Sequence, residues 1–289
     1  MSQQYVRKPA WLKVRLRGNE QFRRTKDIVE SHGLHTICRS GKCPNQSDCW
    51  SRGTATFMIG GDICTRSCRF CNTLTGKPKP LDPREPDEVA ESIRLMGLRH
   101  AVITSVDRDD LPDLGAGHWA ATIRRVKEAN PGLTLEVLIP DFQGRMDLVD
   151  TIIAASPEVI SHNLETVKRL SPQIRSAARY EVSLSVLAYV AGRGICAKTG
   201  IMAGLGETSG EVEELMDEAL RAGVSILTIG QYLQPSRRNI PVSEYVTPEQ
   251  FEAYRTLALS KGFKHVESAP LVRSSYHAEQ GLSVAKPFS

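Results

Sequence analysis

Three cysteines in one short segment have the spacing of an iron–sulfur cluster site. Cys64, Cys68 and Cys71 follow the pattern C-x3-C-x2-C. Three thiolates supply ligands for three irons of a [4Fe–4S] cube and leave the fourth iron open for a substrate or a second cofactor. A zinc site is the alternative, although structural zinc sites usually take four ligands in paired C-x2-C steps. The spacing therefore favours a cluster with one open iron.

A second group of three cysteines lies upstream of the first. Cys38, Cys43 and Cys49 follow the pattern C-x4-C-x5-C, in a stretch whose glycine, proline and asparagine residues predict a loop. Ordinary buried cysteines are the alternative, because free cysteine is often buried. Three cysteines so close together on a loop instead indicate a second cluster, separate from the first.

The composition is that of a large α/β protein without a disulfide framework. The chain has 289 residues, of which 40% are hydrophobic, enough for one large barrel or two ordinary domains. Six of its seven cysteines fall between Cys38 and Cys71, and no signal peptide or bilayer-length apolar run is present. We therefore expect a protein of the reducing cytoplasm, with no membrane partner and with Cys196 as a buried packing residue.

Positive charge is concentrated near the start of the chain, where Glu20 is the one nearby acid. The basic residues are Arg7, Lys8, Lys13, Arg15, Arg17, Arg23, Arg24 and Lys26. A solvated helix face is one interpretation, and a docking patch for an acidic protein partner is the other. The net charge of +4 is mild, so no nucleic-acid partner is expected.

The elements that must position the cysteines alternate between short apolar runs and longer helical segments. The predicted strands cover 54–60, 100–105, 133–139, 159–163, 197–202 and 225–230. The predicted helices cover 20–30, 87–98, 119–130, 145–155, 180–191, 210–222 and 248–261, the last with Thr247 as N-cap and Gly262 as stop. This alternation predicts βα units and a parallel sheet, an α/β fold of the partial (β/α)6 TIM-barrel type. Chemistry in such barrels gathers at the carboxyl ends of the strands, and the triad at 64–71 follows the first strand there.

At this point the motifs resemble a known family. A C-x3-C-x2-C motif after the first strand of a βα barrel is similar to the signature of the radical S-adenosylmethionine (SAM) enzymes. The upstream triad and the C-terminal Val272-Arg-Ser-Ser-Tyr-His277 narrow the resemblance to the lipoyl synthases, and it extends to Lys8-Pro9-x-Trp11-Leu12 near the start. The domains expected are an N-terminal extension (1–53) with the auxiliary cluster cysteines, a radical SAM barrel (54–262) and a C-terminal extension (263–289) with a serine ligand.

The resemblance implies a radical SAM sulfurtransferase that catalyses the last step of protein lipoylation. Two SAM molecules would be cleaved at the cluster of Cys64, Cys68 and Cys71, and the radicals would take hydrogens from C6 and C8 of an octanoyl chain on a carrier lysine. A second [4Fe–4S] cluster would be consumed as the sulfur donor. Its serine ligand matches Ser275, with Ser274 as the alternative.

The resemblance also suggests SAM contacts at three strand ends. Asn163 and Glu165 lie on one face after the fourth strand and match a ribose-binding run, although strand-end capping is the alternative. Gly204 lies in a glycine-rich segment of the adenine-contact type, which is weak as a motif. Thr104 and Ser105 occupy the position at which the superfamily binds the amino group of SAM, but the usual Gly-Gly-Glu motif is absent. The acidic run that follows at 107–110 is expected to face the carrier or to cap the next helix.

The partners implied are octanoylated lipoyl carrier domains, namely 2-oxoacid dehydrogenase E2 subunits and the glycine cleavage H protein. A flavodoxin or ferredoxin would donate electrons, an iron–sulfur carrier protein would repair the spent cluster, and the protein would act as a monomer. One rival is a methylthiotransferase acting on tRNA, which would need a basic nucleic-acid module. The other is a zinc- or cluster-binding regulator without turnover, which would not need polar strand ends in a barrel.

Overall fold

A mostly parallel sheet, wrapped by helices, forms the body of the molecule in the computed structural model, which describes residues 7–14 and 18–281. The strand order is β1-β2-β5-β6-β7-β8-β9-β10, and each neighbouring pair from β2 to β10 is parallel. The strands are β1 (His35–Thr36), β2 (Thr56–Ile59), β5 (His100–Ser105), β6 (Thr134–Leu138), β7 (Val159–Ser161), β8 (Cys196–Ala203), β9 (Ile226–Gln231) and β10 (His265–Ala269). A separate parallel pair joins β3 (Ile63–Cys64) and β4 (Leu74–Thr75). The α/β prediction is confirmed.

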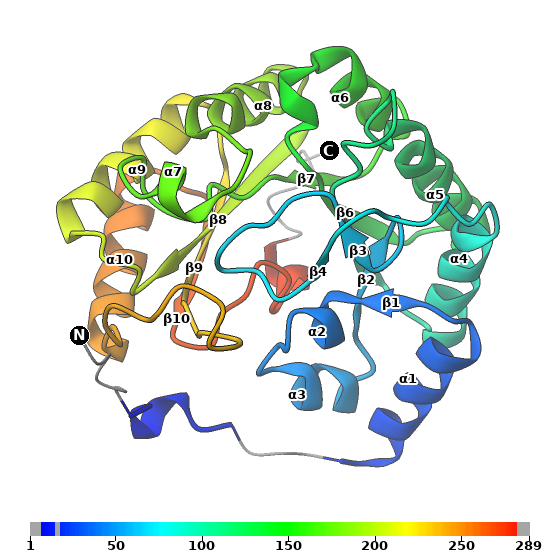
Figure 1. The fold of residues 1–289 in the computed structure, drawn as a ribbon, viewed down its shortest axis with the longest axis horizontal. Helices are drawn as coiled ribbons and strands as arrows, with labels where there is room; N and C mark the ends of the chain where they lie inside the picture. Colours follow the sequence, from blue (N-terminus) through cyan, green and yellow to red (C-terminus); the bar gives the residue numbers. More distant parts are fainter. Residues whose placement is uncertain (1–6, 15–17, 282–289) are drawn as a thin grey trace.

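The helices follow one another around the outside of the sheet (Figure 1). They are α1 (Glu20–Ser31), α4 (Glu85–Met96), α5 (Ala116–Ala129), α6 (Met146–Ile153), α7 (Ser171–Ile174), α8 (Tyr180–Gly192), α9 (Ser209–Arg221) and α10 (Pro248–Lys261). The boundaries of α10 agree with the sequence, because the Thr247 side chain accepts from the N–H of Gln250 and Gly262 adopts a left-handed φ of 117°. None of the described helices is both long and apolar enough to cross a membrane.

Several elements differ from the sequence-based prediction. The stretch expected to be a loop at 38–49 contains two short helices, α2 (Ile37–Ser40) and α3 (Gln46–Ser51), which carry Cys38 and Cys49. Strand β10 extends the sheet beyond the expected strands by pairing with β9. The two-residue strand β1 adds an antiparallel edge to β2. Residues 15–17 of the basic stretch, including Arg15 and Arg17, lie outside the described part.

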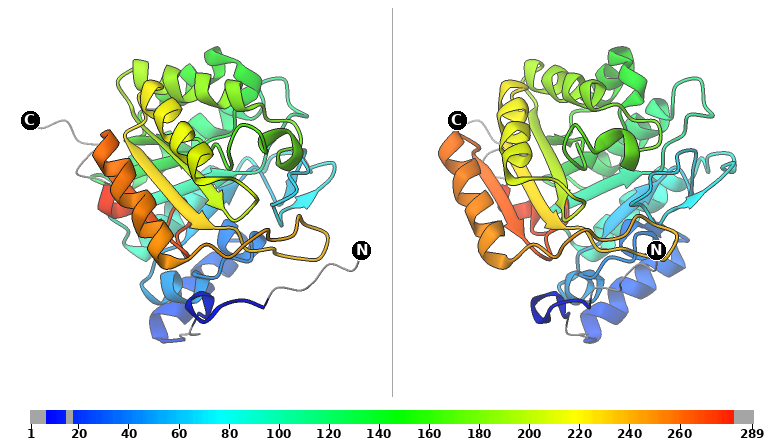
Figure 2. Two further views of the ribbon diagram at one scale, coloured as in Figure 1. Left: turned by 90° about the vertical axis from the view of Figure 1, so that its left-hand side faces the viewer. Right: turned by 60° about the vertical axis from the view of Figure 1, so that its left-hand side comes forward.

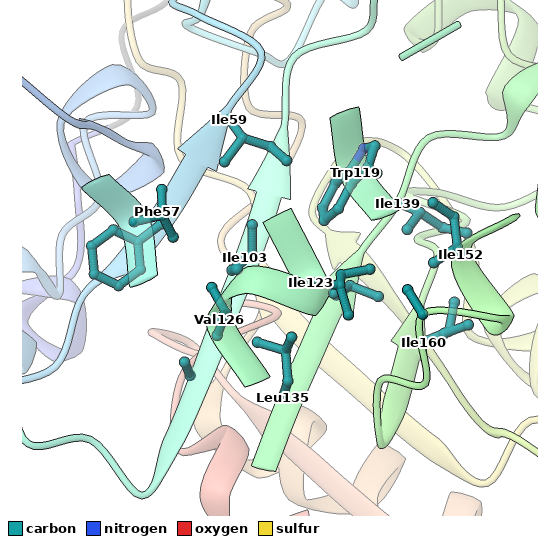
Figure 3. Packing of buried hydrophobic residues seen from close by; sticks show 14 of the residues in the cluster. Phe57, Ile59, Ile103, Trp119, Ile123, Val126, Leu135, Ile139, Ile152 and Ile160 are labelled. Atoms are coloured by element: carbon teal, nitrogen blue, oxygen red, sulfur yellow. The ribbon is translucent and has the colours of Figure 1, made fainter. Parts of the chain in front are cut away.

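The sheet is held by two apolar clusters between its outer face and the helices. In one cluster, Ile103 of β5 and Leu135 of β6 lie beside Ile123 and Val126 of α5, and Phe57 of β2 belongs to the same cluster (Figure 3). The other cluster joins β8 and β9 to α8, α9 and α10. Burying one large apolar side chain of this kind stabilises the fold by about 1.5–3 kcal/mol relative to leaving it exposed. The sheet is therefore a stable support for the loops at its carboxyl edge.

The segment that carries the upstream cysteines meets the segment that follows β10. Helices α2 and α3 lie together at one end of the molecule (Figure 2), and the segment after β10 runs into the centre of the ring of helices (Figure 1). The side-chain amide of Asn45, at the start of α3, donates to the carbonyl of Leu271 at 2.7 Å. Helices α2 and α3 and the segment after β10, which are far apart in sequence, therefore lie next to each other.

Candidate iron–sulfur and substrate site

A cavity of about 660 Å³ opens at the carboxyl edge of the strands and contains both cysteine triads. Its wall includes Cys38, Cys43, Cys49, Cys64, Cys68 and Cys71, together with the tail residues 272–279. The seventh cysteine, Cys196, is half-buried at the start of β8 and is not among the residues that line this cavity. The fold therefore brings together the two cysteine groups that the sequence placed in separate segments.

The loop of the downstream triad is held by hydrogen bonds within the loop and from three remote segments. The thiol sulfur of Cys64 accepts from the N–H groups of Arg66 (3.4 Å) and Asp107 (3.3 Å). The loop N–H of Arg69 donates to the carbonyl of Ile174 at 2.9 Å. The amide of Asn239 donates to the carbonyl of Cys71 at 2.8 Å, so the loop after β9 also holds this segment. N–H groups directed at sulfur are a known means of tuning iron–sulfur clusters.

Arg66, between the first two cysteines of this triad, ties the loop to the ends of β5 and β6. Its side chain is 5% exposed and contacts three carboxylates: Asp109 at 2.8 Å, Asp141 at 2.8 Å and Asp107 at 3.4 Å. The guanidinium lowers the pKa of Asp141 and Asp109 against the opposing effect of burial. A buried ion of this kind needs its partners, because the desolvation penalty of each charge is several kcal/mol. Sequence reasoning missed Arg66, since its partners are remote in sequence.

The acidic run at 107–110 forms ion pairs and does not cap the next helix. Asp107 and Asp109 face Arg66, and Asp110 pairs with Arg108 at 2.8 Å. The start of α5 is capped by Asp113, whose side chain accepts from the N–H groups of Gly115 and Gly117. The expectation that residues 107–110 cap the next helix is thus wrong.

The upstream triad is built from two short helices and is more buried. Burial raises the pKa of Cys38 to about 11 and of Cys49 to about 12, and it also raises the pKa of Cys43. Burial and the nearby Asp107 raise the pKa of Cys64 to about 12. These thiols are protonated at neutral pH without a metal, and iron binding would have to displace the protons.

The tail that carries the two predicted serines crosses the inner face of the sheet. The hydroxyl of Ser275 accepts from Thr56 Oγ1 of β2 at 2.7 Å, whereas Ser274 Oγ accepts from Asn163 Nδ2 at 2.8 Å. Two strand glycines make room for this path. A Cβ on Gly230 would overlap the carbonyl oxygen of Val272, and one on Gly200 would meet Asn163, Thr228 and Ser274. Ser275 thus lies on the β2 side of the tail and Ser274 on the β7 side.

Asn163 and Glu165 both reach the cavity at the end of β7. Among the described residues, Asn163 Oδ1 is buried without a hydrogen-bond partner, so this acceptor is available to a ligand. Glu165 adopts a left-handed φ of 67°, which is unusual for a non-glycine residue and is often found at functional sites. Burial raises the pKa of the Glu165 carboxyl, and the charge of Arg175 opposes that rise.

Arg175 is a cavity residue that sequence reasoning missed. It is 7% exposed, and its guanidinium donates to Ser183 Oγ at 2.8 Å. No carboxylate in the described part of the chain lies within ion-pair distance of it. A buried cation that faces a cavity and has no carboxylate within ion-pair distance among the described residues is a candidate for binding an anionic group. No local motif marks Arg175, so only the tertiary fold reveals it.

The remaining predicted SAM contacts are less open to a ligand. Thr104 and Ser105 line the cavity, but Thr104 Oγ1 donates to the Leu138 carbonyl and Ser105 Oγ accepts from the Trp119 indole. Gly204 is not among the lining residues; its φ of 92° and its contact with Gln231 give a packing reason for glycine there. Lys8, from the basic stretch, does line the cavity.

The donor set fits iron–sulfur clusters in type. Within residues 7–14 and 18–281, no three His, Cys, Asp or Glu side chains converge closely enough to hold a single metal ion. Each triad offers three thiols on the wall of one cavity, and N–H donors already reach Cys64. Thiolates are the ligands that these clusters take, and a hydroxyl from Ser275 lies at the same cavity.

Comparison with known proteins places the chain among radical SAM sequences. Residues 58–219 match the family described as the Radical SAM superfamily. A lipoyl synthase from Parabacteroides distasonis is 76% identical over 279 residues, which cover 96% of this chain and 99% of that protein. Lipoyl synthases from Porphyromonas gingivalis (70% identical, 96% of this chain, 99% of theirs) and Treponema denticola (58%, 95% and 94%) are also similar.

Solved structures with low sequence identity share the fold. Streptococcus suis SuiB bound to S-adenosylmethionine superposes with a TM-score of 0.59 at 10% identity, over 78% of this chain and 55% of that one. Methylornithine synthase (PylB) gives a TM-score of 0.54 at 13% identity, over 88% of this chain and 85% of that one.

Proposed function

The chain belongs to the lipoyl synthase family of the radical SAM superfamily, and from this premise we propose that it inserts two sulfur atoms into a protein-bound octanoyl chain. The insertion sites are C6 and C8, and the product is the lipoyl group of a carrier domain. One observation carries the proposal. Two cysteine triads and a serine hydroxyl, drawn from three separate segments, line a single cavity.

Each triad has a defined part in this reaction. Cys64, Cys68 and Cys71 would hold one [4Fe–4S] cluster with an open iron, while residues 38, 43 and 49 would hold the auxiliary cluster with Ser275 as its further ligand. When bound, the first cluster supplies the electron that splits SAM into methionine and a 5′-deoxyadenosyl radical, and the second supplies the sulfur.

Polar side chains on the β7 side of the cavity suit SAM. Asn163 Oδ1 can accept from a ribose hydroxyl, and Glu165 offers a carboxylate beside it. Arg175, buried and without an acid partner within ion-pair distance among the described residues, suits the carboxylate of the methionine portion. These three residues would orient the nucleoside and the amino acid at opposite ends, which fixes the sulfonium between them.

Apolar side chains in the same cavity suit the octanoyl chain. Val102, Leu138, Ile139, Met202 and Val272 contribute to the wall. A cavity of about 660 Å³ is within the usual range for a small-molecule site, and apolar walls keep water away from a radical. The proposed partners are octanoylated carrier domains, a flavodoxin or ferredoxin and an iron–sulfur carrier protein.

A single-turnover assay tests the function. Anaerobically reconstituted protein is mixed with an octanoyl-lysine peptide, SAM and dithionite, and the peptide is analysed by mass spectrometry. We expect lipoyl peptide and 5′-deoxyadenosine in a ratio near one to two. Deoxyadenosine formation without any sulfur insertion would count against the proposal.

A serine variant and a cysteine control sharpen the same assay. Ser275→Ala is expected to keep SAM cleavage and to impair sulfur insertion, because it removes the further ligand of the auxiliary site alone. Cys196→Ala, outside the cavity lining, is expected to behave as the parent protein. Undiminished lipoyl product from Ser275→Ala would move the ligand to Ser274 or elsewhere.

A further inference from the structure

We propose that Thr56 is the positioning residue that holds the hydroxyl of Ser275 at the auxiliary site. This inference rests on the proposed function, because it concerns how the serine is presented as a ligand. Thr56 is 7% exposed, begins β2 and lines the cavity. Its hydroxyl donates to Ser275 Oγ at 2.7 Å, across a separation of 219 residues in the chain.

Strand β2 also holds the cysteine side of the same site. Thr36, two residues before Cys38, pairs with Phe57 of β2, and Cys38, Thr56 and Ser275 all line the cavity. Neighbouring residues of β2 thereby hold two segments that carry predicted ligands and that are far apart in the chain. Because the sheet fixes the backbone of β2, this strand can position both segments.

The hydrogen-bond chemistry leaves Ser275 able to bind iron. A hydroxyl oxygen has two acceptor lone pairs, so accepting from Thr56 still leaves one free. Ser274 differs, because its hydroxyl accepts from Asn163 Nδ2 at 2.8 Å on the side of the cavity proposed for SAM. The two serines are thus held by different strands, and Thr56 selects Ser275 for the auxiliary side.

The hydroxyl at position 56 is not needed for the strand itself. Valine has the same shape and an equal preference for a buried strand, so sheet formation alone does not explain threonine. The hydroxyl has its partner in Ser275. The pair therefore acts as a link between β2 and the tail.

The test uses protein in which the cluster of Cys64, Cys68 and Cys71 cannot form. In a C64A/C68A/C71A parent, only the auxiliary cluster assembles, and its iron release to bathophenanthroline disulfonate is timed anaerobically. Thr56→Val is expected to release iron about fivefold faster than the parent, as for the loss of one hydrogen bond. Thr56→Ser, which keeps the hydroxyl, is expected to stay near the parent rate. Thr122→Val removes a buried hydroxyl on α5 that bonds only locally to His118, and is the matched control.

A double variant separates positioning from general stability. In Ser275→Ala protein, a further Thr56→Val change is expected to have no effect on iron release, because the partner is already absent. A persistent effect of Thr56→Val there, or a parent-like rate in Thr56→Val alone, would overturn the proposal.

Crystal structures of the iron-free parent and Thr56→Val give a readout that needs no cluster. We expect Ser275 Oγ to turn away from β2 in the variant, and an unchanged position would overturn the inference. If the triple-cysteine parent binds no iron at all, the two-cluster function fails instead, so the two failures are distinguishable.

Discussion

The two cysteine triads share one cavity but are held in different ways. The downstream triad lies on a single loop that is fixed by main-chain hydrogen bonds and by one buried arginine with three carboxylates. The upstream triad depends on contacts between distant segments: Asn45 with Leu271, Thr56 with Ser275, and Asn72 with the carbonyl of Ser40 at 2.8 Å. Both triads therefore depend on contacts with remote segments, but the downstream loop is also tied by the buried ion pairs of Arg66, whereas the upstream site is closed by hydrogen bonds to the tail.

The largest expected contrast comes from removing one cysteine of each triad. Cys68→Ala is expected to abolish SAM cleavage, since the open-iron cluster loses one of its three ligands. Cys43→Ala is expected to keep SAM cleavage and to lose sulfur insertion. Deoxyadenosine and lipoyl peptide are quantified in parallel, and equal loss of both products in the two variants would contradict a division of labour.

Arg66 tests whether the downstream loop depends on its buried charge. Arg66→Met leaves Asp107, Asp109 and Asp141 without their cation, and we expect about 3–5 kcal/mol less stability toward denaturant in the iron-free protein. Arg84→Met is the control, because Arg84 is 77% exposed and solvent screens its pair with Asp82, so we expect little change in stability. A similar loss of stability in both variants would show that the buried ion pairs of Arg66 contribute no more than an exposed pair.

A substitution at Gly230 tests whether the tail must pack on the sheet to complete the upstream site. Gly230→Ala would place a methyl group against the main chain of Val272, which we expect to cost about 3 kcal/mol or to lift the tail from the sheet. Sulfur insertion should then fall while SAM cleavage remains. Gly192→Ala, at the end of α8 with open space around the new methyl, serves as control. A Gly230→Ala protein with full sulfur insertion would contradict this route for the tail.

A smaller effect concerns pH and the β7 side of the cavity. His162 is fully buried between the Ile139 carbonyl and Ser183 Oγ, and burial, aided by Arg175, lowers its pKa to about 4. The unfolded chain has a histidine pKa near 6.5, so it binds the proton first as the pH falls. This group therefore contributes stability above pH 6.5 that is lost as the pH falls toward 4, about 2 kcal/mol between pH 7 and pH 5.

Urea unfolding at both pH values checks this sign. His162→Gln keeps a donor and an acceptor but does not titrate, so its stability should fall less between pH 7 and pH 5 than that of the parent. A parent and variant with the same acid loss would show that His162 is not responsible.

Local signals in the sequence were sufficient to predict much of the fold and the position of the downstream cysteines. The strands, the helix capped by Thr247 and Gly262, and the C-x3-C-x2-C loop each follow from residues within a short window. Strand β10 escaped prediction because His265–Ala269 has only two apolar side chains, which suffice once β9 lies beside it. The helices α2 and α3 were hidden by glycine, proline and asparagine between them.

Other parts of the site, including the side chain that anchors the downstream loop, depend on contacts that have no local signature. Arg66 and Arg175 look like any other arginine in the sequence, and their burial arises from strands that lie far along the chain. Gly204 is the opposite case: the sequence suggested that it contacts a ligand, whereas close packing against Gln231 explains the glycine. The pairing of Thr56 with Ser275 follows only from the path of the tail over β8 and β9.

The path of the tail also sets an order of assembly during synthesis. A ribosome delivers the six clustered cysteines and every strand of the sheet before it delivers Ser275. Since chains begin to fold from the N-terminal side, both triads can be in place while the Thr56 hydroxyl still lacks its partner. We therefore expect the contact between Thr56 and Ser275 to form late, after β10 has joined the sheet.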